Sequence, residues 1–128
     1  LNPVKESYLR FGQSKAPKYI SWSGENRSQL IRIPAASGEY RRAELRSPDP
    51  MANPYLSYAL LIYAGMYGIE NKLDLPPAAE INFFKTDKTT ARQYKELPDT
   101  LEEAKALALK SSFITGHLPQ SIINIYCK

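Results

Sequence analysis

Two arginines and a glutamate alternate in one short segment, Arg42-Ala43-Glu44-Leu45-Arg46. Alternate side chains of a strand lie on the same face, so the pattern predicts one polar face of Arg42, Glu44 and Arg46. Two guanidiniums beside one carboxylate keep net positive charge and leave a carboxylate oxygen for a cation. A divalent metal bound together with phosphates needs this mixture. The alternative interpretation is a solvated ladder of ion pairs that contributes little.

Arg27 and Arg32 add to this pattern from the preceding segment. Arg27 lies in or beside a turn and Arg32 lies inside the next predicted strand. If the strands pair, up to four guanidiniums converge, and arginine suits forked recognition of phosphate and carboxylate. The alternatives are a surface turn residue for Arg27 and a side chain at a sheet edge, with its charged end in water, for Arg32.

Composition limits the possible classes of protein. A chain of 128 residues with 43% apolar residues is long enough for one domain with a real core. The single cysteine, Cys127, excludes an internal disulfide and favours a reducing, cytoplasmic setting, and the single histidine, His117, argues against a histidine-built metal site. The first 46 residues hold nine Lys or Arg against four Asp or Glu, whereas the remainder holds eight against nine. The positive charge is therefore local, and no apolar run is long enough to span a membrane.

The periodicities predict an α+β fold with a small antiparallel sheet packed against helices. The expected strands lie near 18–22, 29–33 and 39–46, with a turn at 23–26 between the first two. The expected helices span about 54–70, 100–111 and 119–128. Asn53 followed by Pro54 predicts the start of the first helix, and Thr100 with Glu103 predicts a capping box for the second. The first helix is apolar nearly all round, so we expect it to be buried on several sides.

Three segments together resemble the catalytic domain of bacterial glutamine synthetase. They are residues 26–34 (NRSQLIRIP), 42–50 (RAELRSPDP) and 52–55 (ANPY), and the resemblance covers nearly the whole chain in order. It implies that residues 1–128 are a C-terminal fragment of that catalytic domain. The N-terminal β-grasp domain and the upstream catalytic sheet would then be absent, in line with a chain that opens at Leu1 without a methionine.

The resemblance implies an ATP-dependent ligase that joins glutamate to ammonia through γ-glutamyl phosphate. Its cofactor would be Mg²⁺ or Mn²⁺, and its full-length form would be a large homo-oligomer with sites shared between subunits, with no nucleic acid or membrane as partner. The fragment alone would be inactive, because it carries one of several metal ligands. By position, the resemblance assigns Arg27 to catalysis, Arg27, Arg32 and Arg42 to ATP, Arg10 and Arg46 to glutamate, and Glu44 to the metal.

Three segments depart from the family pattern, at residues 15–17, 37–39 and 82–84, and the sharpest departure is at 15–17. The family carries Glu-Ala-Pro in a flap over the site, where the glutamate helps to take a proton from ammonium, and this chain has Lys15-Ala16-Pro17. A cation there would repel ammonium. Two other functions therefore stay open: a related ligase that acts on another amine, and a non-catalytic module that binds phosphate or nucleic acid with the same arginines.

Overall fold

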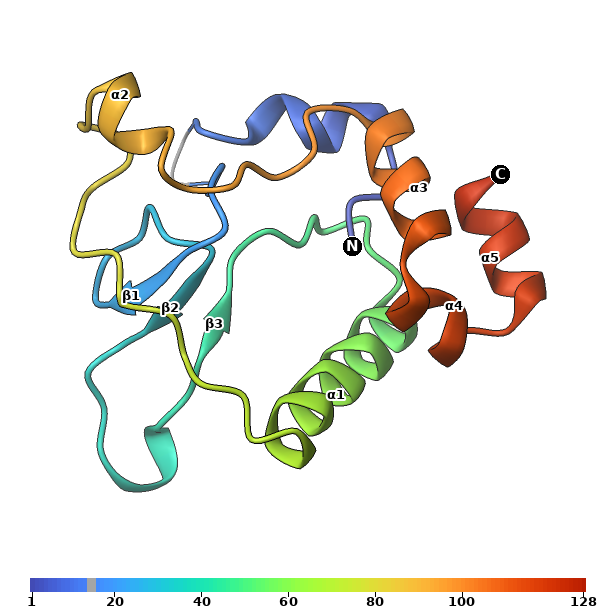
Figure 1. The fold of residues 1–128 in the computed structure, drawn as a ribbon, viewed down its shortest axis with the longest axis horizontal. Helices are drawn as coiled ribbons and strands as arrows, with labels where there is room; N and C mark the ends of the chain where they lie inside the picture. The colour runs from blue at the N-terminus through green and yellow to red at the C-terminus, as the bar shows by residue number, and fades with distance from the viewer. Residues whose placement is uncertain (14–15) are drawn as a thin grey trace. The chain divides into compact units, whose positions relative to one another are not determined.

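The computed structural model describes residues 1–13 and 16–128, which form two compact units (Figure 1). The sheet unit comprises Leu9–Pro48 and Pro76–Leu97, and the helical unit comprises Leu1–Tyr8, Asp49–Leu75 and Pro98–Lys128. A 3-10 helix at Lys5–Arg10 spans the first of the four points where the chain passes from one unit to the other. The combination of a small sheet and several helices confirms the predicted α+β class.

The sheet unit is built on three short strands in the order β1-β2-β3. They are β1 (Trp22–Gly24), β2 (Ile31–Ile33) and β3 (Glu44–Leu45). β2 lies in the centre, with Trp22 opposite Ile31 on one side and Leu45 opposite Ile31 on the other. The strands predicted at 29–33 and 39–46 are confirmed but are shorter than expected, whereas the strand predicted at 18–22 is displaced, since β1 shares only Trp22 with it and extends into the predicted turn at 23–26.

The prediction of an antiparallel sheet is wrong for one of the two strand pairs. β1 and β2 run parallel, and only β2 and β3 are antiparallel. The residues after Gly24 do not form a hairpin turn between these strands. Glu25 adopts a left-handed backbone with φ 55°, and the Asn26 side chain accepts a hydrogen bond from the Ser28 amide. The chain thus folds back across itself, and β2 begins beside Trp22.

The first half of the predicted strand at 18–22 pairs elsewhere. Tyr19 forms an isolated antiparallel bridge with Glu96, and the Ile20 amide donates to the Lys95 carbonyl at 2.8 Å. The predicted strand at 39–46 is also shorter, because a 3-10 turn at Gly38–Tyr40 precedes it. That turn begins with a positive φ of 57° at Gly38, a conformation that glycine adopts without strain.

The helical unit contains the three predicted helices nearly at their predicted bounds. They are α1 (Pro54–Glu70), α3 (Leu101–Lys110) and α5 (Gln120–Cys127). The predicted caps are confirmed, since Asn53 accepts from the amides of Tyr55 and Leu56, and Thr100 accepts from the Glu103 amide. Two short helices were not predicted, α4 (Ser112–His117) in this unit and α2 (Lys88–Ala91) in the sheet unit.

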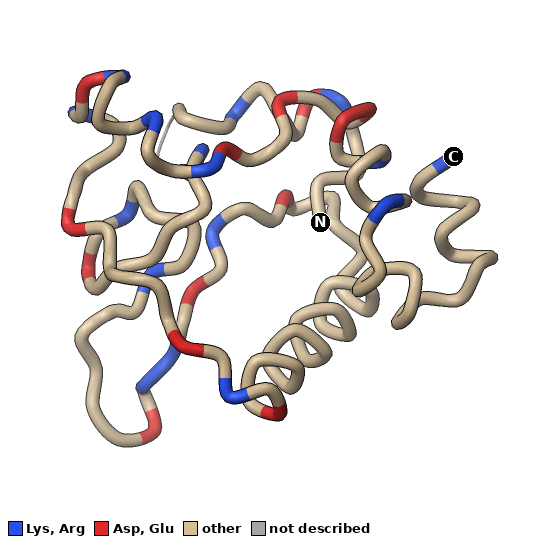
Figure 2. The backbone as a smooth tube through the Cα atoms, in the orientation of Figure 1, with Lys and Arg blue, Asp and Glu red and all other residues tan. Residues whose placement is uncertain are grey.

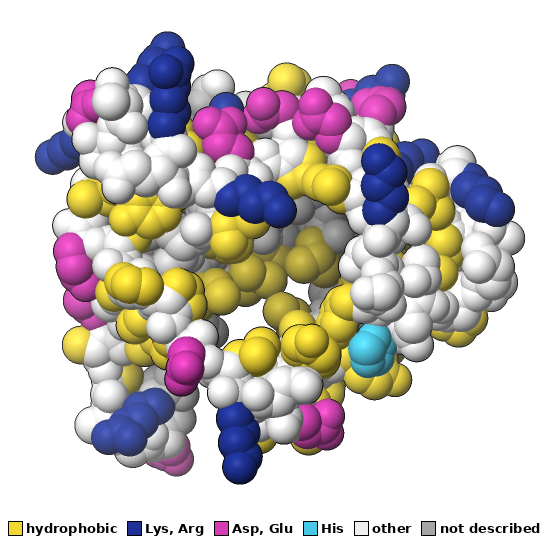
Figure 3. All heavy atoms as spheres, viewed as in Figure 1, with side chains coloured by type: hydrophobic (Ala, Val, Ile, Leu, Met, Phe, Trp, Pro, Cys, Tyr) yellow, Lys and Arg dark blue, Asp and Glu magenta, His cyan; other side chains and the backbone are white. Residues whose placement is uncertain are grey.

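Helix α1 carries no charge before Glu70, its last residue (Figure 2). Its partner within the unit is α4, through rings of Tyr63 and His117 whose centroids lie 4.5 Å apart. The expectation of burial on several sides is wrong, because every residue of α1 is half-buried or exposed in the structure. Hydrophobic side chains accordingly reach the surface along this helix (Figure 3), and Tyr55 is 84% exposed.

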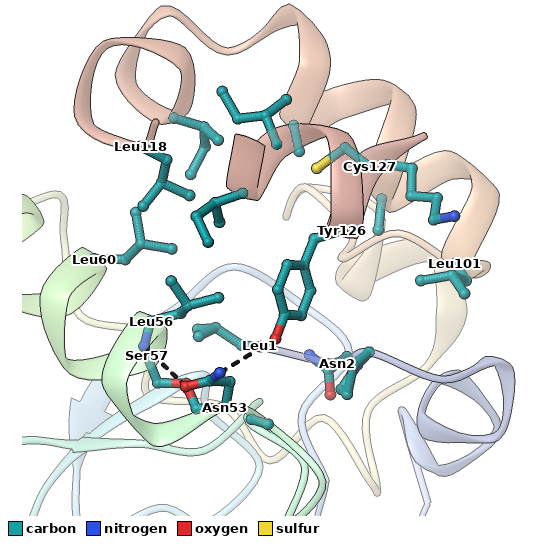
Figure 4. Close-up of a pocket in the computed structure, with 18 of the residues that line it drawn as sticks. Leu1, Asn2, Asn53, Leu56, Ser57, Leu60, Leu101, Leu118, Tyr126 and Cys127 are labelled. Carbon is teal, nitrogen blue, oxygen red and sulfur yellow. Dashed lines mark hydrogen bonds between the residues drawn. The ribbon is translucent and has the colours of Figure 1, made fainter. Parts of the chain in front are cut away.

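The core of the helical unit surrounds an apolar cavity of about 170 Å³ between α1, α3, α4 and α5 (Figure 4). Leu56, Leu60 and Leu118 line it, and the Asn53 amide donates to the Tyr126 hydroxyl at 3.2 Å on its rim. These apolar linings are typical of the interior of a helical unit. No helix in the described part of the chain is long and apolar enough to cross a membrane.

Candidate anion and metal site

Three guanidiniums surround the Glu44 carboxylate in the sheet unit. Arg32 Nη1 lies 3.0 Å from Glu44 Oε2, Arg42 Nη2 lies 3.0 Å from Oε1, and Arg46 Nη1 lies 3.9 Å from Oε2. The predicted polar face of Arg42, Glu44 and Arg46 is therefore confirmed, and Arg32 joins it. Along the backbone near β3, one acidic position lies between basic ones (Figure 2).

The sheet register brings Arg32 to this face. Arg32 in β2 is directly opposite Glu44 in β3, so their side chains emerge on the same side of the sheet. The Arg32 side chain is 13% exposed and that of Glu44 is 27% exposed, whereas Arg42 is 53% exposed. The ion pair between Arg32 and Glu44 is thus partly shielded from water. Because β2 is the central strand, Arg32 does not lie at a sheet edge, but the alternative of a ladder of cross-strand ion pairs stays open.

The arginines also set the ionisation of Glu44. The hydrogen bond from Arg32 holds the pKa of the Glu44 carboxyl below its ordinary value of 4.5, partial burial opposes this shift, and Arg42 lowers the pKa further. Glu44 therefore stays ionised under mildly acidic conditions. A cation that approaches this face meets a carboxylate rather than a neutral acid.

This shift predicts how the stability of the sheet unit depends on pH. Because the pKa of Glu44 is lower in the folded state, its stabilising contribution is present above pH 4.5 and is lost as the pH falls through the folded-state pKa. In denaturant titrations followed by the fluorescence of Trp22, Glu44→Gln should unfold earlier than the parent chain at about pH 6–8. The two midpoints should converge in acid. A difference that does not depend on pH would show that Glu44 acts through packing rather than charge.

Arg27 approaches the cluster through its main chain. Arg46 Nε donates to the Arg27 carbonyl at 3.1 Å, and the Arg27 side chain is exposed. Burial lowers the pKa of Arg46, Glu44 raises it, and the charges of Arg32 and Arg27 lower it. The last two effects are the repulsion expected where guanidiniums outnumber carboxylates, and an anion bound here would relieve that repulsion.

Arg10 lies close to the end of β3, where its guanidinium donates to the Ser47 carbonyl. Arg10 therefore contacts the residue that follows Arg46, although 37 positions separate Arg10 and Ser47 in the sequence. Lys15, the residue that departs from the family pattern, lies outside the described residues.

Both Glu44 oxygens contact guanidiniums, Oε1 from Arg42 and Oε2 from Arg32 and Arg46, so the expectation of a carboxylate oxygen left over for a cation is wrong. A carboxylate is still a suitable ligand for a hard divalent cation, which would share these oxygens with the arginines. Mg²⁺ is commonly bound by one or two carboxylates together with phosphate oxygens and water, and Glu44 supplies one such carboxylate beside arginines suited to phosphate. Among residues 1–13 and 16–128, no group of three or more His, Cys, Asp or Glu side chains gathers as a metal site. Glu44 therefore fits the role of one ligand rather than of a complete site.

The sequence did not point to Glu25, which belongs to the same network. Its carboxylate lies 3.6 Å from Arg32 Nη2, and its carbonyl accepts from Arg32 Nε at 3.0 Å. The side chain of Glu25 is 64% exposed, so it contributes less to the network than Glu44. A glutamate in a turn gives no periodic signal that would have indicated this role.

Comparisons with known proteins agree with the resemblance. The family described as "Glutamine synthetase, catalytic domain" matches residues 1–128. Proteins named glutamine synthetase from Methanosarcina mazei and Thermus thermophilus are each 44% identical, over 98% and 94% of this chain, and one from Staphylococcus epidermidis is 40% identical over 96%. The chain spans only 28–29% of the length of these relatives. With a match over its whole length, this chain belongs to the glutamine synthetase catalytic-domain family.

Proposed function

We propose that this chain supplies the phosphate-binding and part of the metal-binding surface of a ligase that joins glutamate to ammonia. In this proposal the reaction uses ATP and passes through γ-glutamyl phosphate, as the family implies. The observation that carries the proposal is the single carboxylate of Glu44 among three guanidiniums, with Arg32 and Arg42 at 3.0 Å. Such a cluster stabilises negative charge on a transferring phosphoryl group.

Each arginine has a proposed role. Arg27 and Arg32 bind the ATP phosphates, and Arg27 also stabilises the transferring phosphoryl group as the catalytic residue of this chain. Arg42, which is more exposed, binds ATP at the edge of the cluster. Arg46, and Arg10, whose guanidinium contacts the carbonyl of the residue after Arg46, bind the carboxylate of glutamate.

Glu44 would hold Mg²⁺ or Mn²⁺, which when bound neutralises charge on the phosphate oxygens. Residues 1–128 would then act as the C-terminal part of the catalytic domain, with further metal ligands from outside these residues. Since Glu44 supplies one carboxylate, we expect no glutamine formation by the 128-residue chain alone. The complete enzyme would be a large homo-oligomer.

A chimeric enzyme tests the proposal directly. This chain would replace the 128 residues that it matches in the Methanosarcina mazei glutamine synthetase. The chimera should form glutamine from glutamate, ammonium and ATP with Mg²⁺, and Arg27→Ala should abolish most of that activity. A chimera that assembles at the size of its parent enzyme but makes no glutamine would contradict the proposal.

The second candidate function is a ligase for another amine, and the observation that favours it is Lys15. A lysine in place of the flap glutamate disfavours ammonium as substrate, because both carry positive charge. The same chimera, supplied with hydroxylamine in place of ammonium, separates the two functions, because hydroxylamine is mostly uncharged at neutral pH. Faster turnover of hydroxylamine than of ammonium, reversed by Lys15→Glu, would favour the second.

A further inference from the structure

The loop that carries Arg27 is bonded on both sides to a segment more than fifty residues away in the sequence. Gln29 Nε2 donates to the carbonyls of Ala79 at 3.0 Å and Ile81 at 2.8 Å. Asn26 Nδ2 donates to the same Ile81 carbonyl at 2.7 Å. These bonds join the loop to the main chain of the 79–83 segment.

A third side chain completes the contact. The Phe83 amide donates to Ser28 Oγ at 2.9 Å, and Ser28 Oγ in turn donates to Asn26 Oδ1 at 2.9 Å. The Ser28 amide also donates to Asn26 Oδ1, at 3.0 Å. The side chains on either side of Arg27 are therefore connected both to each other and to the 79–83 segment.

Burial makes this network hold one geometry. Gln29 is 0% exposed and Ser28 is 1% exposed, so neither can exchange its protein partners for water without opening the loop. Among the described residues, Gln29 Oε1 has no hydrogen-bond partner. The buried Gln29 amide is therefore held by the two hydrogen bonds that its Nε2 donates.

Arg27 is placed differently from its neighbours. Its side chain is exposed, and its carbonyl accepts from Arg46 Nε at 3.1 Å. Residues 26, 28 and 29 thus bond the loop around residue 27 to the 79–83 segment, and Arg46 bonds its carbonyl to the arginine cluster. The guanidinium of Arg27 extends from this hydrogen-bonded backbone.

We propose that Asn26, Ser28 and Gln29 are positioning residues for Arg27, with the 79–83 segment as their template. This inference rests on the proposed role of Arg27 in phosphoryl transfer. A displaced guanidinium binds ATP nearly as well but stabilises the transition state less, so loss of the network lowers kcat more than it raises the KM for ATP.

The test uses Gln29→Met in the chimeric enzyme, a change that keeps side-chain length and removes both donors. We expect kcat to fall roughly 10- to 100-fold, while the KM for ATP changes less than about threefold. Ser28→Ala, a smaller change, should lower kcat in the same way but less. The matched control is Trp22→Phe, which removes the bond from Trp22 Nε1 to the Pro76 carbonyl, away from Arg27, and should leave kcat within about twofold.

A double-mutant cycle shows whether Gln29 acts through Arg27. If it does, Arg27→Ala with Gln29→Met should be no slower than Arg27→Ala alone. If the two substitutions lower kcat additively, or if Trp22→Phe lowers kcat as much as Gln29→Met, the positioning role is overturned. The loss of activity would then reflect a general loss of stability. Full activity of Arg27→Ala would instead refute the proposed function of Arg27. Hydrogen exchange of the Phe83 amide gives a readout independent of activity, and it should accelerate in Gln29→Met while the amides of α3 keep their rates.

Discussion

Glutamine formation by the chimeric enzyme should fall on the order of a hundredfold when Glu44 is replaced with Gln. The substitution keeps the shape of the side chain but removes the only carboxylate that contacts Arg32, Arg42 and Arg46 together among the described residues. Three guanidiniums without a counter-charge repel a divalent cation. The Mg²⁺ concentration for half-maximal activity should therefore rise together with the loss of rate.

Two control variants identify the cause of this loss. Glu25→Gln removes the other carboxylate near Arg32, but Glu25 is 64% exposed, so the Mg²⁺ requirement should stay within about twofold of that of the parent chimera. Glu44→Asp keeps the charge and should retain more activity than Glu44→Gln. If Glu44→Gln reduces the rate without changing the Mg²⁺ requirement, Glu44 serves only to hold the arginines.

Arg46→Lys should raise the KM for glutamate roughly tenfold or more, since loss of one charge-assisted hydrogen bond costs ~1.5–3 kcal/mol. Lysine keeps the positive charge but lacks the planar fork that binds a carboxylate through two parallel bonds. Arg46 is 19% exposed, so little water is available to replace the missing donor. The KM for ATP should change much less, and initial rates measured against each substrate separately check both expectations.

Arg41→Lys is the matched control, because Arg41 is the exposed neighbour of Arg42 and has no proposed role. It should leave both Michaelis constants close to those of the parent chimera. Equal weakening of glutamate and ATP by Arg46→Lys would show that Arg46 supports the sheet and the Arg27 loop rather than glutamate.

The parts that could be predicted from the sequence depend on local chemistry. Asn53 and Thr100 cap their helices by bonds to amides two or three residues away, so a few neighbouring residues are enough to predict each cap. The common face of Arg42, Glu44 and Arg46 follows from the alternation of side chains along an extended chain. It holds although only Glu44 and Leu45 of that segment form a regular strand.

The parts that could not be predicted depend on long-range pairing. The parallel arrangement of β1 and β2 and the left-handed backbone of Glu25 between them are features that residue types alone do not indicate. Gln29 appeared as an ordinary strand residue, because its partners are carbonyls at Ala79 and Ile81 and every residue carries a carbonyl. The prediction that α1 is buried was wrong for a related reason. An apolar pattern indicates that a helix needs a packing partner, but it does not show where in the fold that partner lies.

The bond between Arg46 Nε and the carbonyl of residue 27 has a consequence for how this surface can evolve. Arg46 recognises a main-chain group that all twenty amino acids possess, so exchange of the side chain at position 27 leaves the bond available. The dependence is therefore one-directional: a substitution at position 27 removes the Arg27 guanidinium but leaves this bond, whereas a substitution at position 46 removes both the Arg46 guanidinium and its bond to the loop. A change at position 46 is therefore felt at two places on this surface, while a change at position 27 is felt at one.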